Sequence, residues 1–375
     1  MIARKITSDI LANLYRGKAI VILGARQSGK TTLLRELGSH EANKLYLNCD
    51  EADDRKALEI QSTAALRNLI GKHKLLLIDE AQRVRDIGIT LKLIIDNIPG
   101  VQVIATGSSS FELSNRINEP LTGRKYEYLL HPFSYQELAE EHGSFSEHKL
   151  LEDRLLYGFY PEIVIRQGEQ QTLLNALVGS YLYKDIFTFQ DLRKPELLEN
   201  LLRALALQIG SEVSYTELAQ LVKTDHSTIQ RYIRLLEHAF IIFRLSNYSS
   251  NLRNEIKRSR KIYFWDNGVR NCLIDDFRKI DSRDDIGKLW ENYIVSERMK
   301  LLANNQMYRH SYFWRNVNNA EIDYLEFYNS RLDAYEIKWN PKRALSAEAF
   351  KRNYSEASIA RIDKGNYQAF LNPEA

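Results

Sequence analysis

The sequence is poor in cysteine and has no long hydrophobic run. Its 375 residues include two cysteines, Cys49 and Cys272, which stand far apart and match no metal-binding spacing. We expect both to be reduced residues with packing roles, as is typical of a reducing compartment. No stretch approaches the about 18 consecutive apolar residues of a membrane span, and the first residues lack the apolar core of a signal peptide. These absences predict a cytoplasmic protein with no membrane partner.

An excess of one charge is also missing. The net charge is +3, from 52 basic and 49 acidic residues, so the position of the charges matters more than their total. The length predicts about two to three domains. A content of 44% hydrophobic and 27% charged residues is typical of folded, soluble proteins.

Short apolar runs alternate with helical patterns in the first 150 residues. Runs that are apolar throughout indicate strands covered on both faces, and therefore a parallel sheet flanked by helices. We expect an α/β domain whose strands cover residues 19–23, 44–49, 74–79, 101–106 and 126–130.

The stretch GARQSGKTT follows the first of these runs and opens a helical pattern. It satisfies G-x-x-x-x-G-K-[ST], a pattern whose glycines let backbone N–H groups curl around a phosphate at a helix start. Lys30 is expected to reach the β and γ phosphates of ATP, and the Thr31 hydroxyl to ligate Mg²⁺. The alternative is a flexible turn before a helix. The expected nucleotide-binding residues are Gly24, Ala25, Arg26, Gln27, Ser28, Gly29, Lys30, Thr31 and Thr32.

Two carboxylates at the end of the third run complete this expected site. In LLLIDEAQ, four apolar residues carry Asp79 to a strand end, where it could hold the Mg²⁺ hydration shell. The adjacent Glu80 could orient and polarise the attacking water. An N-cap pair in a first helical turn is the alternative. The fourth run ends in ATGSSS, where we place Ser108, ahead of Thr106, as a sensor of the γ phosphate; an ordinary serine turn also explains this segment.

Four segments resemble one protein family. VILGARQSGKTTLL, LLLIDEAQ, ATGSSSFEL and LTGRKYEYLLHPFSYQEL are similar to the AAA-type ATPase domain of a widespread prokaryotic family whose C-terminal half is a domain of unknown function. The resemblance covers nearly the whole chain and implies a P-loop fold with an additional strand. It also implies that Arg124 is suited to the γ phosphate, where a guanidinium stabilises developing charge. A role on its own nucleotide, on a neighbour's in a homo-oligomer, or in a surface salt bridge stays open.

A winged helix-turn-helix is expected over residues 196–262, after a helical lid and linker at 151–195 to which we assign no chemistry. Three helical patterns are followed by the apolar strand FIIFRL, and S-x-x-E at Ser214 predicts a capping box for the second helix. The third would be the recognition helix, whose polar stripe is available to duplex DNA. Such modules also serve packing and protein contacts. The stripe consists of Ser227, Gln230, Arg231 and Arg234.

A basic segment follows between two expected strands. RNEIKRSRK, residues 253–261, carries five basic residues and one acid, and Lys257, Arg258 and Arg260 are candidate phosphate contacts. Solvated surface charge is the alternative.

The last segment, residues 263–375, holds a second candidate site. Glu291 lies on an expected amphipathic helix, Asp323 in an expected hairpin, and Glu336 on a strand. Alternate side chains of a strand share a face, so Glu336 and Lys338 should point together. The three carboxylates could hold Mg²⁺ while Lys338 polarises water or stabilises charge.

This arrangement resembles the PD-(D/E)xK restriction-endonuclease-like fold, with EID in place of PD. A salt-bridged surface strand is the alternative, and Asp266, in the segment before this domain, is expected to be a helix cap rather than a catalyst. Two functions stay open. The first is an ATP-driven enzyme that cleaves DNA with a metal; the second is an ATP-gated switch that binds DNA or protein through a catalytically silent fold.

Overall fold

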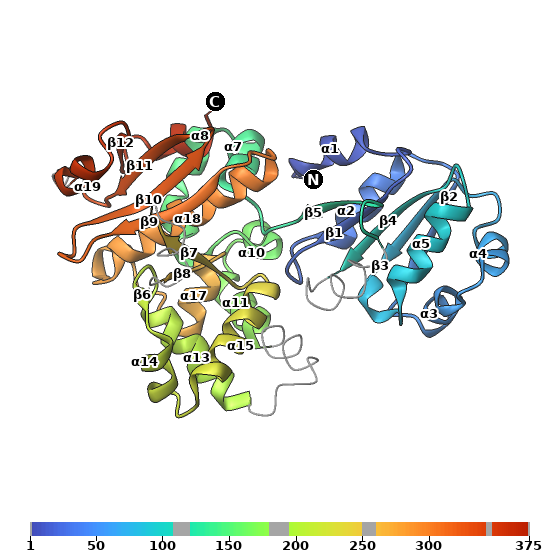
Figure 1. Cartoon of the computed structure of the whole chain (residues 1–375), viewed down its shortest axis with the longest axis horizontal. Coiled ribbons are helices and arrows are strands. Elements are labelled where there is room, and N and C mark those ends of the chain that lie inside the picture. The colour runs from blue at the N-terminus through green and yellow to red at the C-terminus, as the bar shows by residue number, and fades with distance from the viewer. Residues whose placement is uncertain (1, 108–120, 180–194, 250–259, 343–346, 374–375) are drawn as a thin grey trace. The chain divides into compact units, whose positions relative to one another are not determined.

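The computed structural model describes residues 2–107, 121–179, 195–249, 260–342 and 347–373 (Figure 1). The chain forms two compact units. The first comprises Met1–Pro132 with His238–Phe240, and the second comprises Phe133–Glu237 with Ile241–Ala375. The division after Pro132 falls earlier than the boundary expected at residue 150, and the finer boundaries at 195 and 262 stay predictions.

The first unit is built on a parallel sheet of five strands in the order β2-β3-β4-β1-β5. The strands are β1 (Ala19–Leu23), β2 (Lys44–Asn48), β3 (Leu75–Asp79), β4 (Gln102–Gly107) and β5 (Lys125–Leu129). β1, β3 and β4 are buried at every position, whereas the edge strands β2 and β5 are partly exposed. The expected α/β domain with a parallel sheet is therefore confirmed, and β4 is the additional strand between β1 and β3.

Helices cover this sheet on both sides (Figure 1). Apolar side chains of α2, among them Leu33 and Leu37, pack against Ile20 of β1 and Leu77 of β3, and α1 adds Ile10 to the same core. The elements are α1 (Ile6–Ala12), α2 (Lys30–Ser39), α3 (Ala52–Glu59), α4 (Thr63–Ile70), the short 3-10 helix η1 (Ala81–Arg83) and α5 (Ile87–Asn97).

The second unit contains a seven-stranded mixed sheet in the order β12-β11-β10-β9-β7-β8-β6. Its strands are β6 (Glu212–Val213), β7 (Ile242–Asn247), β8 (Arg260–Phe264), β9 (His310–Arg315), β10 (Glu321–Tyr328), β11 (Arg331–Ile337) and β12 (Ser358–Ile362). β7 pairs antiparallel with β8 and parallel with β9. One sheet therefore joins strands from the expected winged helix-turn-helix and from the expected nuclease-like segment.

Helices before, between and after these strands complete the second unit. The C-terminal part runs α18, then β9, β10 and β11 as an antiparallel meander, then α19 and β12, with β12 parallel to β11. The helices are α7 (Tyr135–His142), α8 (Ser144–Lys149), α9 (Leu151–Tyr157), α10 (Pro161–Ile165), α11 (Gln170–Leu177), α13 (Pro195–Leu207), α14 (Tyr215–Leu221), α15 (His226–His238), α17 (Asn267–Leu273), η3 (Ile280–Ser282), α18 (Ile286–Asn304), α19 (Glu348–Asn353) and α20 (Tyr367–Leu371).

The expectation that α18 is amphipathic is wrong. Most of its residues are buried, including charged ones on several sides of the helix. The charges are balanced inside the unit: Arg298 is bonded to Glu326, and Lys300 to Glu297. Because buried ion pairs satisfy these side chains, polar residues do not mark a solvent face here.

The segment around Gly158 and the segment around Gly268, to which the sequence assigned no chemistry, pack closely against each other at these two glycines. A Cβ at Gly158 would lie 2.1 Å from Asp266 Oδ1, and a Cβ at Gly268 would lie 2.1 Å from the Tyr157 carbonyl oxygen. Asp266 accepts the Phe159 N–H at 2.7 Å and the Val269 N–H at 3.1 Å. Burial raises the pKa of this carboxyl. Asp266 is thus the N-cap of α17, as expected.

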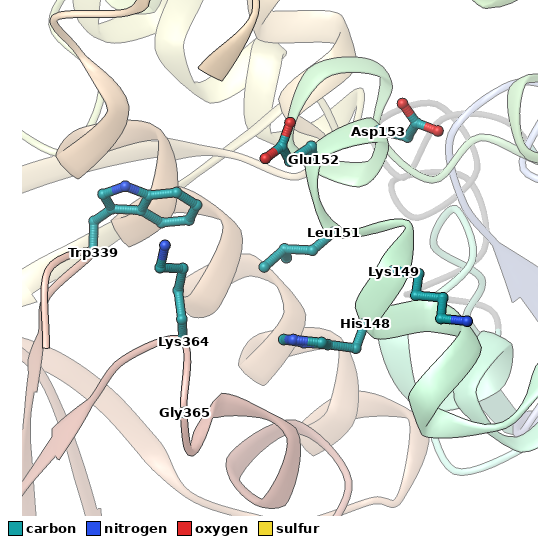
Figure 2. Close-up of a pocket in the computed structure, with 8 residues that line it drawn as sticks. All are labelled: His148, Lys149, Leu151, Glu152, Asp153, Trp339, Lys364 and Gly365. Atoms are coloured by element: carbon teal, nitrogen blue, oxygen red, sulfur yellow. The ribbon is translucent and has the colours of Figure 1, made fainter. Parts of the chain in front are cut away.

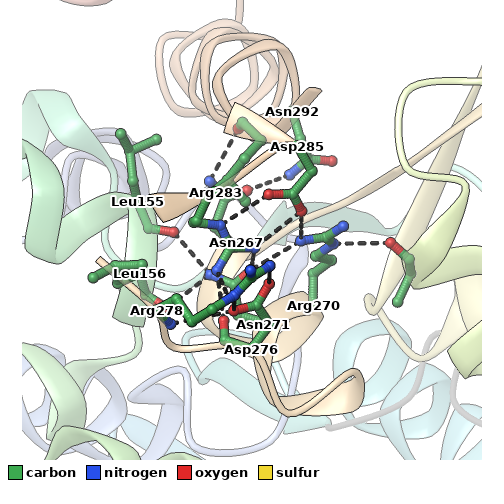
Figure 3. Close-up of polar contacts among 12 residues, drawn as sticks. Leu155, Leu156, Asn267, Arg270, Asn271, Asp276, Arg278, Arg283, Asp285 and Asn292 are labelled. Atoms are coloured by element: carbon green, nitrogen blue, oxygen red, sulfur yellow. Dashed lines mark hydrogen bonds and ion pairs between the residues drawn. The ribbon is translucent and has the colours of Figure 1, made fainter. Parts of the chain in front are cut away.

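A buried polar network extends from α17 toward the start of α18 (Figure 3). Arg270 donates to Asp285 Oδ2 at 2.6 Å and to the Ala206 carbonyl at 2.8 Å. Arg283 donates to the same carboxylate and to Asn271. Asn271 in turn donates to two main-chain carbonyls of α9 at 3.0 Å. The network ties α9, α13, α17 and the start of α18 to one another.

The two cysteines are free thiols, and Cys49 is buried. Burial, reinforced by Asp54 and Asp79, raises the pKa of Cys49 to about 12, so the thiol stays protonated. Within the described ranges, every helix is too short or too polar to cross a lipid bilayer.

Candidate functional site

The glycine-rich loop, residues 24–29, connects the carboxyl end of β1 to the first turn of α2. Gln27 and Gly29 have left-handed φ angles of 56° and 97°. Gly24 has no room for a side chain, because its Cβ would lie 2.1 Å from the Leu130 carbonyl oxygen. The close approach follows from the bond of the Leu130 N–H to the Leu23 carbonyl at 2.7 Å, which continues the pairing of β5 with β1. Glycine at position 24 is therefore required by packing.

Lys30, the first residue of α2, folds back over this loop. Its side chain is buried, and Nζ donates to the Gly24 carbonyl at 2.9 Å and the Ala25 carbonyl at 2.8 Å. Both acceptors are neutral main-chain oxygens. The ammonium group can therefore exchange them for an anion that enters the loop.

Asp79 ends β3 beside this loop and is held on both oxygens. Oδ1 accepts the Thr106 hydroxyl at 2.5 Å, and Oδ2 accepts the Tyr46 hydroxyl at 2.9 Å. Burial, with the bond to Asp79, raises the pKa of Tyr46 to about 12, so the phenol remains a donor. The carboxylate is buried and oriented from both neighbouring strands, β2 and β4.

Glu80 follows in a left-handed conformation, with φ of 53°. Its main-chain N–H donates to the Thr106 hydroxyl oxygen at 3.2 Å, and its carboxylate accepts the Gln82 side-chain amide. Thr106 thus links the two acidic residues, donating to one and accepting from the other. Sequence reasoning ranked Thr106 below Ser108 and missed Tyr46 and Gln82; the position of Thr106 at the end of the neighbouring strand was the available signal.

The polar stripe of α15 lies where the sequence predicted. Ser227, Arg231 and Arg234 are exposed, and Gln230 is half-buried. Asp225, which the sequence reasoning did not single out, accepts the Thr228 N–H at 2.9 Å and the Ser227 hydroxyl, and so caps this helix. Ser214 likewise accepts the Glu217 N–H at the start of α14.

Of the three candidate phosphate contacts in the basic segment 253–261, Arg260 begins β8 and is half-buried. Its partners on the neighbouring strands are Val213 and Ser246. Lys257 and Arg258 lie outside the described residues.

In the second unit, the structure brings Asp323, Glu336 and Lys338 together. Lys338 Nζ donates to Asp323 Oδ2 at 2.8 Å and lies 3.6 Å from Glu336 Oε2. The Ile337 N–H donates to the same oxygen of Asp323 at 2.8 Å. Glu336 lies in β11 and Lys338 directly after its last residue, and their side chains approach each other. The Asp323 carboxylate is the leading charge that holds the pKa of Lys338 above its usual value in spite of burial.

Glu291 has different partners. Its Oε1 accepts from Lys261 Nζ at 2.9 Å and from the Tyr263 hydroxyl at 2.7 Å. Lys261 also forms an ion pair with Glu321. Burial raises the pKa of Glu291 against the pull of Lys261. Lys261 and Tyr263 alternate along β8 and so share a face, which is the sequence signal that would have revealed them inside an otherwise apolar run.

The expectation that Glu291, Asp323 and Glu336 ligate a metal is not met by this geometry. Among the residues that the structure describes, no three acidic, histidine or cysteine side chains are grouped so that they could hold a metal ion. Lysine ammonium groups, rather than a shared space, lie between the carboxylates. The residues present therefore do not fit a bound divalent ion in this conformation.

A cavity of about 600 Å³ lies elsewhere in the second unit. Figure 2 shows the Trp339 indole on one side and the side chains of Leu151 and His148 on the other. The ammonium group of Lys364 lies 4.2 Å from the centre of the indole ring, and His148 Nδ1 lies 3.1 Å from the Tyr367 hydroxyl. The cavity thus combines an aromatic wall with cationic groups.

Parts of this chain match a known protein family and a solved structure. The family described as "AAA domain" matches residues 16–139, which contain the glycine-rich loop, Asp79 and Glu80. The Walker-type ATPase of Pyrococcus abyssi aligns with 73% of this chain and 96% of its own, with a TM-score of 0.51 and 18% identity, which is a likeness of fold. The first unit has the fold of an AAA-type ATPase domain.

The rest of the chain matches families without an assigned role. Residues 148–283 match a domain of unknown function (DUF8612) and residues 286–369 another (DUF4143). An uncharacterized protein of Mycobacterium tuberculosis is 27% identical over 93% of this chain and 76% of its own length. An uncharacterized protein of Haemophilus influenzae is 26% identical over 90% and 88%. These relatives match across the ATPase domain and the second unit together.

The ATPase domain fits a nucleotide and its magnesium ion on chemical grounds. The loop offers main-chain N–H groups, a buried ammonium group and the positive end of α2 to phosphates. Hydroxyl and carboxylate oxygens, from the half-buried Thr31 and from Asp79, are the hard donors that Mg²⁺ prefers.

Arg124 is not near this loop. It precedes β5 and bonds Asp96 at 2.7 Å, and its backbone carbonyl accepts the N–H of Ala19, the first residue of β1. The loop leaves the opposite end of β1, about 17 Å away at about 3.3 Å per strand residue. An arginine side chain does not span that distance, so a role on the nucleotide of its own chain is excluded. Ser108 lies outside the described residues.

Proposed function

We propose that the protein hydrolyses ATP in the first unit and uses nucleotide state to control DNA binding by the second. The observation that carries the first part is the linkage of Asp79 and Glu80 through Thr106 at the strand ends beside the loop that Lys30 covers. This is the set of groups that phosphoryl transfer requires: a phosphate cradle, a cation, a metal-directed carboxylate and a base for water.

Lys30 would exchange its two carbonyl partners for the β and γ phosphates of ATP, with Thr31 and Asp79 directed at the magnesium ion and its water. When bound, that ion neutralises charge that develops on the phosphate oxygens. Asp79 needs no rearrangement for this role, because Tyr46 and Thr106 already hold its two oxygens.

Glu80 would orient and deprotonate the attacking water. Its carboxylate is engaged with Gln82, so water must compete with that amide for the same oxygens. Thr106 acts as a positioning residue, since its hydroxyl bonds Asp79 and receives the Glu80 N–H.

Two substitutions test the ATPase proposal. Lys30→Ala should abolish ATP binding, because the loop loses the buried ammonium group that is directed at the phosphates. Glu80→Gln should keep ATP affinity within about twofold and lower hydrolysis by about 10² to 10⁴, the usual contribution of general base catalysis. Affinity is measured with a fluorescent ATP analogue and hydrolysis by phosphate release. Retained binding in Lys30→Ala would refute the site.

The exposed stripe of α15 supports DNA binding by the second unit. Helices α13, α14 and α15 followed by the antiparallel pair β7 and β8 have the order of a winged helix-turn-helix, with Arg231 and Arg234 on the open side of the third helix. The order α18, β9, β10, β11, α19, β12 is in keeping with a restriction-endonuclease-like fold. Trp339 and Lys364 add an aromatic ring and a cation of the kind that contacts nucleic acid.

The carboxylate geometry favours binding over cleavage. Because lysines neutralise Asp323 and Glu291, we infer a switch rather than a metal-dependent nuclease. Arg231→Ala with Arg234→Ala should weaken duplex binding and lower its salt dependence, whereas Lys351→Ala with Arg352→Ala, on α19, should not. Nicking of plasmid DNA in Mg²⁺ or Mn²⁺ that disappears in Glu336→Ala would instead establish the nuclease function.

A further inference from the structure

We propose that Lys261 is the resident cation of the C-terminal carboxylate cluster and that its ammonium group takes the place a divalent metal would otherwise occupy. The cluster is defined as Glu291, Glu321, Asp323 and Glu336. The inference extends the proposed switch, in which lysines neutralise Asp323 and Glu291, and it does not depend on ATP hydrolysis.

Lys261 is more deeply buried than any carboxylate it meets. Its side chain is 1% exposed, against 12% for Glu291 and 28% for Glu321. Its ammonium group is paired with both of these carboxylates, while the Tyr263 hydroxyl donates to the oxygen of Glu291 that Lys261 also contacts. The Phe313 ring, with its centre 5.5 Å from Nζ, closes another side.

The lysine remains charged in this setting. Burial by itself lowers the pKa of an ammonium group, but Glu291 and the other nearby carboxylates outweigh it and hold the pKa of Lys261 well above its usual value. The ion pairs with Glu291 and Glu321 therefore place a positive charge at the buried end of the cluster.

A divalent ion could not share the cluster with this ammonium group. Mg²⁺ needs about six oxygens at about 2.1 Å in near-octahedral geometry. The inner oxygen of Glu291 instead faces Lys261 and Tyr263, and Oδ2 of Asp323 faces Lys338 and a main-chain N–H. Repulsion between Lys261 and an added ion would also be poorly screened at a buried site.

The backbone around Lys261 is held in place by hydrogen bonds to neighbouring elements. Phe264, further along β8, is hydrogen-bonded to Asn292 of α18. Its N–H donates to Asn292 Oδ1 at 2.8 Å, and its carbonyl accepts from Asn292 Nδ2 at 3.0 Å. β8 is also paired with β6 and β7. Lys261 is therefore carried into the cluster by a strand from the expected winged helix-turn-helix.

The test is Mn²⁺ binding to the full-length protein without nucleotide, followed by electron paramagnetic resonance. The wild type should bind no Mn²⁺ ion whose binding depends on Asp323. Lys261→Met should gain one such ion, bound at least about tenfold more tightly than by the wild type. The gain should disappear when Asp323→Asn is added.

A stability measurement provides a second readout. Tryptophan fluorescence reports the second unit, since all four tryptophans, Trp265, Trp290, Trp314 and Trp339, lie in it. Mn²⁺ should raise the melting temperature of Lys261→Met and leave that of the wild type unchanged. Lys351→Met, which removes an exposed lysine of α19 in the same unit, is the matched control and should behave as the wild type.

If Lys261→Met does not fold, Lys261→Gln keeps a donor for Glu291 while removing the charge, and the same gain of Mn²⁺ is expected. An Asp323-dependent Mn²⁺ ion in the wild type would overturn the proposal. So would a folded Lys261 variant that binds no more Mn²⁺ than the wild type. Neither result would bear on Lys30 or on ATP hydrolysis, so this inference and the proposed ATPase function fail separately. An Asp323-dependent Mn²⁺ ion in the wild type would also argue against the proposed switch.

Discussion

Two buried lysines, one in each unit, have opposite kinds of partners. Lys30 donates to two neutral carbonyl oxygens of its own loop, whereas Lys261 is paired with two carboxylates on other elements. A lysine held by neutral acceptors gains energy when an anion replaces them. A lysine held by carboxylates in a dry site has nothing to gain from a new ligand. The comparison separates Lys30, which we expect to bind an anionic ligand, from Lys261, which we propose takes the place of a metal ion.

The largest expected effect is on stability, and it should differ between the two lysines. Lys261→Met leaves Glu291 and Glu321 without their buried cation, which we expect to cost about 3 to 5 kcal/mol of the free energy of unfolding of the second unit. Lys30→Met removes the donor to the Gly24 and Ala25 carbonyls, and we expect a cost of about 1 kcal/mol in the first unit.

Each unit has its own probe for this measurement. Denaturation of the second unit is followed by tryptophan fluorescence, and that of the first by labelling of the buried Cys49 in a Cys272→Ser background. Equal losses of stability would break the distinction between the two lysines.

The next effect concerns the loop itself. Gly24→Ala pushes a methyl group against the Leu130 carbonyl, so the loop must move, and we expect ATP affinity to fall by about 1.4 to 2.7 kcal/mol, roughly tenfold to a hundredfold. The control is Gly287→Ala in α18, where a Cβ meets open space; it should leave ATP affinity unchanged and add up to about 1 kcal/mol of stability. Unchanged affinity in Gly24→Ala would argue against phosphate binding at this loop.

Thr106 provides a smaller and more specific test of the first site. Thr106→Val removes the donor to Asp79 and the acceptor of the Glu80 N–H, and we expect kcat to fall by about tenfold, equivalent to about 1.4 kcal/mol, with little change in ATP affinity. Thr106→Ser keeps the hydroxyl and should restore most of the rate. A valine variant with the wild-type rate would show that the hydroxyl link is dispensable.

Lowering the pH should destabilise the second unit through protonation of Glu147. Burial opposes ionisation of this carboxyl, but two bonds from Arg154 at 2.9 Å outweigh it and lower its pKa. A lowered pKa stabilises the folded state above the unfolded value of about 4.3, and this stabilisation is lost as pH falls through the lower folded value. Glu147→Gln should therefore flatten the dependence of the unfolding free energy on pH below about 4.3. An unchanged slope in tryptophan-detected denaturation would contradict the assignment.

The smallest effect is expected at Arg124, which is partly exposed and paired with Asp96. Surface pairs of this kind contribute about 0 to 1 kcal/mol, so Arg124→Ala should leave hydrolysis within about twofold of the wild type. The assay is run over a range of protein concentrations. A large loss that appears only at high concentration would mean that Arg124 acts on the nucleotide of a neighbouring chain.

The parallel sheet was predictable because its signal is local. Each buried strand is a short, continuous apolar run, and the five observed strands begin and end within one residue of the expected bounds. The glycine-rich loop was predictable for the same reason, since its torsions and its place between β1 and α2 depend on neighbouring residues. The amphipathic reading of α18 failed because the partners of its buried charges, such as Glu326 for Arg298, lie on strands that follow it.

The amino-acid sequence by itself therefore determined the order of the strands and helices, the loop at Gly24 to Lys30 and the acidic pair after β3, because each is specified by residues close together in the chain. Only the tertiary structure decided which side chains neutralise one another. It placed Arg124 at the far end of the sheet from the loop, put Thr106 between two acids, and brought Lys261 to Glu291 across 30 positions of sequence. Charges interact through space, so their pairing is known only when the chain has folded.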